Sequence, residues 1–123
     1  MKGLLPLVLL LGGCATSAVP LAKLGQARDG SRVSVPGELH TQSGAYRLFH
    51  LCPDASAADT YRTCIDLVVP ERLQASLPAE QGACVVPSGR FHAFGPDRIG
   101  LGNYYSTIGY IVVSRVARCT GQR

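Results

Sequence analysis

The sequence is poor in the features that mark several common classes of protein. Its 123 residues include no tryptophan and a single methionine, and only 7% are aromatic and 16% charged. Basic residues form no run, so the stripe of positive charge that marks a nucleic-acid-binding face is missing. No nucleophile elbow, P-loop or HExxH motif occurs, and no two cysteines have C-x-x-C spacing. The sequence therefore indicates no familiar catalytic class and no zinc or thioredoxin-like site.

The apolar run near the amino terminus is too short for a transmembrane helix, which needs about 20 residues. Lys2 precedes the run Leu4–Leu11, and two glycines and a cysteine follow it. A positive start, a short apolar run and small residues are typical of a secretory signal peptide. Leu11-Gly12-Gly13-Cys14 resembles the lipobox of bacterial lipoproteins, which is an aliphatic residue, two small residues and a cysteine. The resemblance implies a diacylglycerol on Cys14, cleavage before it and acylation of the new amino terminus. The alternative is an ordinary signal peptide with a cysteine nearby.

Removal of the signal peptide, residues 1–13, leaves 110 residues, enough for one domain with one core. The remaining chain has eleven basic and eight acidic side chains, a net charge of +3. Ala15, and not an aspartate, follows the lipobox cysteine. By resemblance to other lipoproteins, this implies anchoring in the outer membrane, facing the periplasm. Residues 14–29 show no sustained periodicity, so we expect a lipidated flexible tether there and a folded domain over residues 30–123.

The folded domain is predicted to be all-β with one short helix. Strand-like segments span residues 32–41, 46–51, 64–69, 83–94 and 108–119, and the first and fourth contain proline and glycine, which mark bends. Pro70–Leu77 has a proline at the first helical position and leucines four residues apart, which favours a two-turn helix. Three strands, a helix and two strands resemble the OB-fold, a five-stranded Greek-key barrel. The alternative is a meander barrel without the helix.

Four cysteines remain when Cys14 is assigned to lipid, and an even number in an exported domain indicates disulfides. Four cysteines allow three pairings. In the OB order the second and third strands pair, as do the fourth and fifth. The resemblance therefore implies the bridges Cys52–Cys64 and Cys84–Cys119. The alternative is that one pair stays reduced.

Histidines and carboxylates give no clear chemical site. His40 and His92 occupy equivalent places in the two bent strands, so they could approach one another, with Glu38 nearby. Two histidines without a clear third ligand seldom bind a metal tightly, so we expect solvated histidines, no metal and no cofactor. Asp66 interrupts an apolar strand and is expected to face water.

Ligands of OB-folds are bound by the loops after the first and fourth strands and by the face of the second and third strands. The loop Pro96–Tyr105 is rich in glycine and carries two tyrosines. Its Gly100-Leu101-Gly102 segment lacks the third glycine and the helix of a dinucleotide site. The candidate partner contacts are Arg47, Phe49, Tyr104 and Tyr105. In the alternative, the tyrosines fold back over the barrel.

These features predict a non-enzymatic, membrane-anchored module that binds an envelope protein or a glycan. Nucleic acid is not expected as a partner, because export separates the domain from it. A second hypothesis is an inhibitor or immunity lipoprotein. Ser43-Gly44-Ala45-Tyr46 resembles the Ser-Gly-x-x-Tyr loop of membrane-bound lysozyme inhibitors but is one residue shorter. A catalyst is the third class, and no nucleophile–base pair is visible for it.

Overall fold

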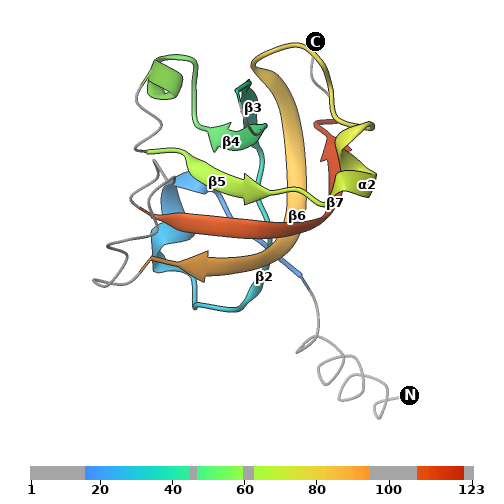
Figure 1. Ribbon diagram of the computed structural model, residues 1–123. Helices are drawn as coiled ribbons and strands as arrows, with labels where there is room; N and C mark the ends of the chain where they lie inside the picture. Colours follow the sequence, from blue (N-terminus) through green and yellow to red (C-terminus); the bar gives the residue numbers. More distant parts are fainter. Residues whose placement is uncertain (1–15, 45–46, 60–62, 95–107, 121–123) are drawn as a thin grey trace.

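The computed structural model describes residues 16–44, 47–59, 63–94 and 108–120 (Figure 1). They form a strongly curved sheet with short helices. The strands are β1 (Ser17–Ala18), β2 (Arg32–Ser34), β3 (Gly37–Gln42), β4 (Leu48–Cys52), β5 (Ile65–Val68), β6 (Ala83–Ala93) and β7 (Gly109–Arg118). The helices are the 3₁₀ turns η1 (Leu21–Gln26) and η2 (Ser56–Asp59) and the α-helix α2 (Glu71–Gln74). Among the described residues, no helix is long and apolar enough to cross a membrane.

The sheet closes into a barrel. Its strand order is β1-β2-β6-β3-β4-β5-β7, and an additional pairing of β6 with β7 completes the circle. Because β2 and β3 both pair with β6, they are two halves of one strand that bends around Pro36. The barrel thus has five strands, β2 with β3, β4, β5, β6 and β7, and β1 is added at its edge. In the chain, α2 lies between β5 and β6, the third and fourth strands of the barrel. This all-β order is the one predicted from the sequence.

Glycine and proline produce the bend of β6, which Figure 1 shows curving around the barrel. Its register against β7 shifts between Ser88 and Gly89. A Cβ atom on Gly89 would overlap the Val112 carbonyl and lie 3.0 Å from the Val113 Cα. Only glycine therefore permits this approach of the two strands, as is common at a bulge.

Strand alternation fills the barrel with aliphatic side chains and the rings of Phe49 and Phe91. The core includes Leu39, Leu51, Ile65, Phe91 and Ile111, each at most 2% exposed. Helix α2 spans four residues with Pro70 at its N-cap, so it is shorter than the predicted two turns and is too short to be stable alone. Leu73 and Leu77 are partly buried against the core, so packing holds this segment in place.

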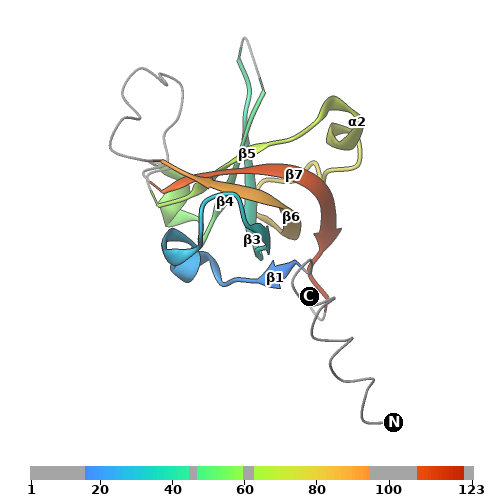
Figure 2. The ribbon, with the colours of Figure 1, turned by 90° about the horizontal axis from the view of Figure 1, so that it is seen from below.

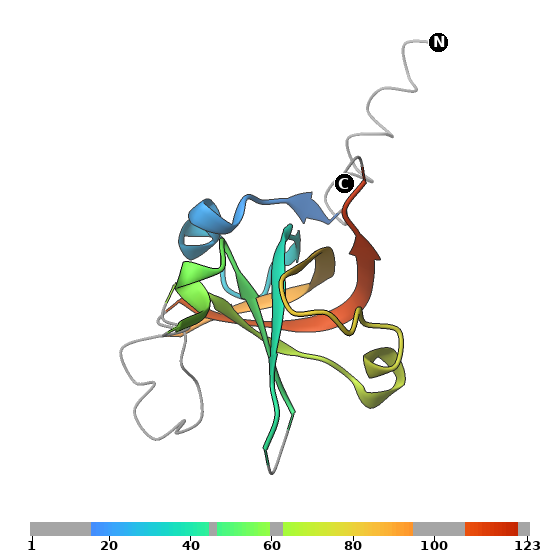
Figure 3. The same cartoon turned by 90° about the horizontal axis from the view of Figure 1, so that it is seen from above.

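The amino-terminal segment belongs to the barrel. Leu21 and Leu24 are 9% and 0% exposed, because residues three apart lie on the same side of a 3₁₀ helix. β1 pairs with β2 in parallel, and the Val19 amide donates to the Ser34 carbonyl at 3.0 Å. Figures 2 and 3 show β1 and η1 on the side of the barrel opposite α2. The prediction of a flexible tether over residues 14–29 is therefore wrong for residues 17–26.

We expect Leu24→Ala to lower the free energy of unfolding by about 3 kcal/mol, because it leaves a cavity in the core. Lys23→Ala is the matched control, since Lys23 is exposed in the same helix, and its effect should stay within about 0.5 kcal/mol. Urea unfolding of the two variants measures both values. Equal stability of Leu24→Ala and the parent chain would contradict this account and support the prediction of a flexible tether.

Both expected disulfides are present. Cys52 bonds Cys64, twelve residues later, and Cys84 bonds Cys119, thirty-five residues later. Between the first two, Asp54 accepts hydrogen bonds from the Ser56 hydroxyl at 2.8 Å and the Ala57 amide at 2.9 Å. These bonds, the Ser56 hydroxyl first, lower the pKa of Asp54. This small contribution to stability is present above the ordinary aspartate pKa and is lost as the pH falls through the lowered value.

Candidate binding face

A row of polar and aromatic side chains crosses the outer surface of the barrel. The register places His40 opposite His50, His50 opposite Asp66, Asp66 opposite Tyr110, and Tyr110 opposite His92. Residues directly opposite one another project from the same face of a sheet, whereas successive residues alternate between faces. The chain neighbours of this row include a core residue on each of the five strands, among them Leu39, Leu51, Ile65, Phe91 and Ile111. The row therefore lies outside the barrel, across five consecutive positions of the closed sheet.

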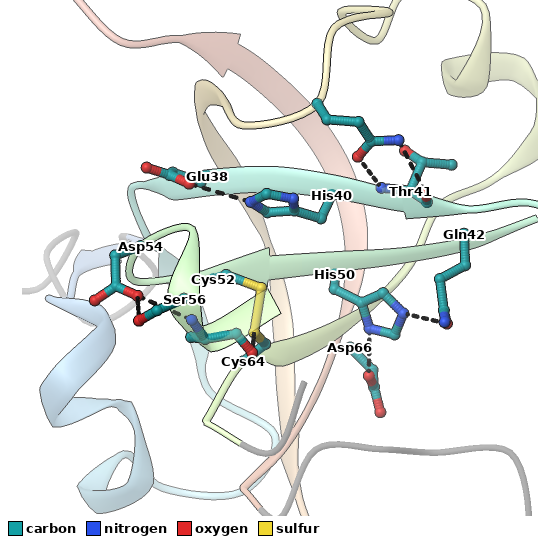
Figure 4. Close-up of a disulfide and its surroundings, with 12 residues drawn as sticks. Glu38, His40, Thr41, Gln42, His50, Cys52, Asp54, Ser56, Cys64 and Asp66 are labelled. Carbon is teal, nitrogen blue, oxygen red and sulfur yellow. Dashed lines mark hydrogen bonds and ion pairs between the residues drawn. A yellow bond between two sulfur atoms is a disulfide. The ribbon is translucent and has the colours of Figure 1, made fainter. Parts of the chain in front are cut away.

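His50 occupies the centre of a polar brace that joins three strands. Its Nδ1 lies 3.0 Å from Asp66 Oδ1, and its Nε2 lies 3.0 Å from Gln42 Oε1 (Figure 4). His50 is 2% and Asp66 5% exposed. Gln42 comes from β3, His50 from β4 and Asp66 from β5. Hydrogen bonds in such a buried site are strong, so the brace fixes the relative positions of these strands.

One carboxylate oxygen of the brace has no partner among the described residues. Asp66 Oδ2 is buried and makes no hydrogen bond there. A buried carboxylate is costly unless it is paired, so Asp66 depends on its contact with His50. The expectation that Asp66 faces water is wrong, because the outer face of β5 is covered at this point.

A second contact holds the free edge of β3. The Thr41 amide donates to Gln81 Oε1 at 2.8 Å, and Gln81 Nε2 donates to the Thr41 carbonyl at 2.9 Å. The pairing of β3 with β6 ends at Leu39 and Ala83, so this side-chain amide replaces the missing strand. Beyond this point β3 and β4 project from the barrel as an arm, visible in Figure 3. The described residues nearest the end of the arm are Ser43, Gly44 and Arg47.

The predicted contacts Arg47 and Phe49 have different fates. Phe49 is 4% exposed and belongs to the core, so the prediction that it contacts a partner is wrong. The physical reason is that successive side chains of a strand point to opposite faces of the sheet, so Phe49 points into the barrel and its neighbour His50 points outward. Arg47 is exposed, and its Cζ lies 5.3 Å from the centre of the Phe49 ring. This cation–π contact keeps Arg47 near the base of the arm. Tyr104, Tyr105 and the lipidation site Cys14 lie outside the described residues.

His40 and His92 do not meet. His40 Nε2 lies 3.1 Å from Glu38 Oε1, within the same strand. His92 Nδ1 lies 3.7 Å from Asp29 Oδ1, and its ring stacks on Tyr110 with centroids 5.1 Å apart. The strand pairing explains this, because β6 contacts β3 near Ala83 and has curved away at His92. Within the described chain, no three His, Cys, Asp or Glu side chains gather as metal ligands do.

Solved structures of similar fold are known, although no protein-family model matches the sequence and no curated protein is significantly similar to it. The Stn1-Ten1 complex of S. pombe matches at TM-score 0.51 and 11% identity, over 88% of this chain and 80% of that chain. An OBody, AM3L15, bound to hen egg-white lysozyme matches at 0.54 and 18%, over 85% and 94%. Asparaginyl-tRNA synthetase of Entamoeba histolytica matches at 0.53 and 12%, over 85% of this chain and 23% of that chain. The barrel is an OB-fold.

These neighbours correct one prediction about partners. Nucleic acid was excluded because of the expected export of the domain. The similar structures include telomere capping protein Ten1 and tRNA synthetases, so this fold occurs in proteins of telomeres and of tRNA charging. The exclusion of nucleic acid is therefore wrong. Identities this low show the fold alone, and the ligand must be argued from the side chains of this chain.

In OB-fold terms, the brace occupies the face through which these barrels usually bind. β4 and β5 are the second and third strands of the barrel, and Ser43 and Gly44 follow the first. The sequence did not reveal the brace, because its members are eight and sixteen residues apart in the chain. The available signal was that His50 and Asp66 are polar residues within two apolar strands. That they lie opposite one another could be seen only once the register of the two strands was known.

Proposed function

We propose that this chain is a non-enzymatic OB-fold binding module, anchored to the outer membrane through Cys14, that binds an envelope protein or glycan. The brace of Gln42, His50 and Asp66 is the observation that carries this proposal. It holds β3, β4 and β5 rigidly where OB-folds bind their ligands, and rigid support of this kind lowers the entropic cost of binding. The contacts in this proposal are Arg47, at the arm, and Tyr104 and Tyr105, which lie outside the described residues.

The surroundings of His50 favour binding over catalysis. A histidine paired with an aspartate is the base-and-orienter arrangement of many hydrolases. A general base must also present its second nitrogen to the substrate. Here Nε2 of His50 contacts Gln42 Oε1, and the side chain is almost completely buried. The pair therefore serves as a structural support.

Anchoring through Cys14 places the barrel close to the bilayer. β1 begins at Ser17, three residues after Cys14, and three extended residues span about 11 Å at most. In this proposal the lipoprotein works near the headgroups, without the long tether expected from the sequence. Its partner is then a component of the membrane surface or one that approaches it.

Recovery of partners from envelope extracts tests the function. We expect the wild-type chain to retain a specific partner, and Arg47→Ala and Tyr104→Ala/Tyr105→Ala to lose about tenfold in affinity, as at typical interface hot spots. Arg118→Ala is the matched control, since it removes an exposed arginine at the end of β7. A labelled oligonucleotide is titrated in parallel. Equal recovery by all four chains, or binding of the oligonucleotide alone, would contradict the proposal.

A second candidate is an inhibitor of a lysozyme-like enzyme. Ser43 and Gly44 are exposed at the arm, and OBodies bound to hen egg-white lysozyme have the same fold. An OB barrel can therefore carry a lysozyme-binding surface. An assay of lysozyme activity decides between the candidates, because an inhibitor at micromolar concentration slows cell-wall hydrolysis. An unchanged rate removes this candidate.

A further inference from the structure

A groove of about 380 Å³ is lined by residues of β2, β6 and β7 and by Pro70 and Arg72 at the start of α2. Figure 1 labels these four elements. Three arginines line the groove: Arg32 from β2, Arg90 from β6 and Arg72 from α2. We call it the arginine groove. Its residues are different from those of the candidate binding face, apart from His92 at the end of the polar row. The function proposed above does not use it.

The three arginines have no acidic partner among the described residues. Arg32 and Arg90 are directly opposite one another in the antiparallel pair β2–β6. Like charges at opposite positions of a ladder destabilise it. None of the three guanidinium groups forms an ion pair within the described residues, although Glu71 adjoins Arg72 on the surface of α2. An anion between them would relieve the repulsion.

One of the arginines is already oriented. Arg90 Nη1 donates to the Gly30 carbonyl at 2.8 Å, which fixes the guanidinium plane and leaves its other N–H groups to donate elsewhere. A fixed guanidinium loses less conformational entropy when it binds an oxyanion, and its fork matches phosphate oxygens in pairs.

The floor of the arginine groove is apolar. Val112 lines it and is 40% exposed, and Val68, directly opposite Val112 on β5, is 42% exposed. These are the two large hydrophobic side chains that are most exposed in the described chain. The groove therefore offers positive charge beside an apolar strip, which suits a phosphate joined to an organic group.

We propose that the arginine groove binds a phosphate-bearing ligand, in which Arg32 and Arg90 hold the phosphate oxygens and Arg72 adds a third positive charge. Val112 contacts the group that carries the phosphate. Two sources share this chemistry, a soluble phosphate compound and a phospholipid headgroup. The volume of the groove is enough for one such group.

Titration calorimetry with inorganic pyrophosphate tests the proposal, on the full chain carrying Cys14→Ser so that it has no lipid. We expect saturable binding that weakens with salt and falls about tenfold or more in Arg32→Gln and in Arg90→Gln. Arg115→Gln is the matched control, because it removes an exposed arginine of β7 that does not line the groove. Circular dichroism confirms that each variant is folded.

Further arms distinguish the sources. Co-sedimentation with phosphatidylcholine vesicles that contain phosphatidylglycerol indicates a phospholipid headgroup, if it depends on Arg32 and Arg90. Binding of pyrophosphate without binding of vesicles indicates a soluble ligand. Absence of both overturns the proposal. So does an equal loss in Arg115→Gln, which would show a response to net charge alone. Binding of an oligothymidylate without binding of pyrophosphate also overturns it, because the surface would then recognise a strand.

Discussion

Replacement of Asp66 by alanine is expected to lower the free energy of unfolding by about 3 kcal/mol, because it leaves a buried polar group of His50 without its hydrogen-bond partner. Asp66 and His50 are 3.0 Å apart and almost completely buried. Without the carboxylate, Nδ1 of His50 loses its acceptor, and water cannot replace it cheaply in a closed site. The strand β5 also loses its polar link to β4.

Urea unfolding followed by circular dichroism measures this effect, with Glu38→Gln as the matched control. Glu38 contacts His40 at a similar distance, 3.1 Å, but its side chain is 33% exposed, so we expect a loss below about 1 kcal/mol. The double variant His50→Leu/Asp66→Leu should recover most of the stability, because replacing both partners of a buried hydrogen bond by apolar groups is often nearly neutral. If Asp66→Ala and Glu38→Gln prove equally mild, the brace does not hold the face together.

Removal of the Cys84–Cys119 bridge has the second large effect. The chain-entropy treatment gives about 4 kcal/mol for a loop of thirty-five residues and about 3 kcal/mol for the twelve-residue loop of Cys52–Cys64. The longer loop includes most of β6 and β7, the two strands that close the barrel. We therefore expect Cys84→Ser/Cys119→Ser to be the more damaging double variant.

The measurement compares urea midpoints of the two double variants with that of the oxidised parent, each with and without a reductant. Reductant should destabilise the parent strongly and each double variant less. A parent chain whose midpoint does not respond to reductant would show that the bridges contribute nothing to stability.

The bent-strand architecture could be predicted from the sequence because its signals are local. Pro36-Gly37 and Pro87-Ser88-Gly89 mark the two bends, and Pro70 marks the start of the helix. Each acts through the backbone of its own segment, by fixing φ, removing a donor or permitting close approach. The disulfide pairs then followed from the strand order.

The candidate binding face could not be predicted, because it depends on register. Phe49 and His50 are neighbours in an apolar segment, and one residue of slip exchanges the inner and outer side chains. The sequence therefore suggested Phe49 as a contact, and the structure places it in the core while His50 supports the face. The segment Leu21–Gln26 was missed for another reason, since two leucines in six residues are too few to show a period.

The exclusion of nucleic acid failed because it rested on location and not on the binding surface. The proposed location at the outer membrane depends on lipidation of Cys14, and so does the proposal of a lipid-anchored module. Mass spectrometry of the protein from its native cells tests that proposal most directly. We expect the amino-terminal peptide to begin at Cys14 and to carry a diacylglyceryl group and an amide-linked acyl chain. An intact peptide that retains residues 1–13, or an unmodified Cys14, would contradict the account.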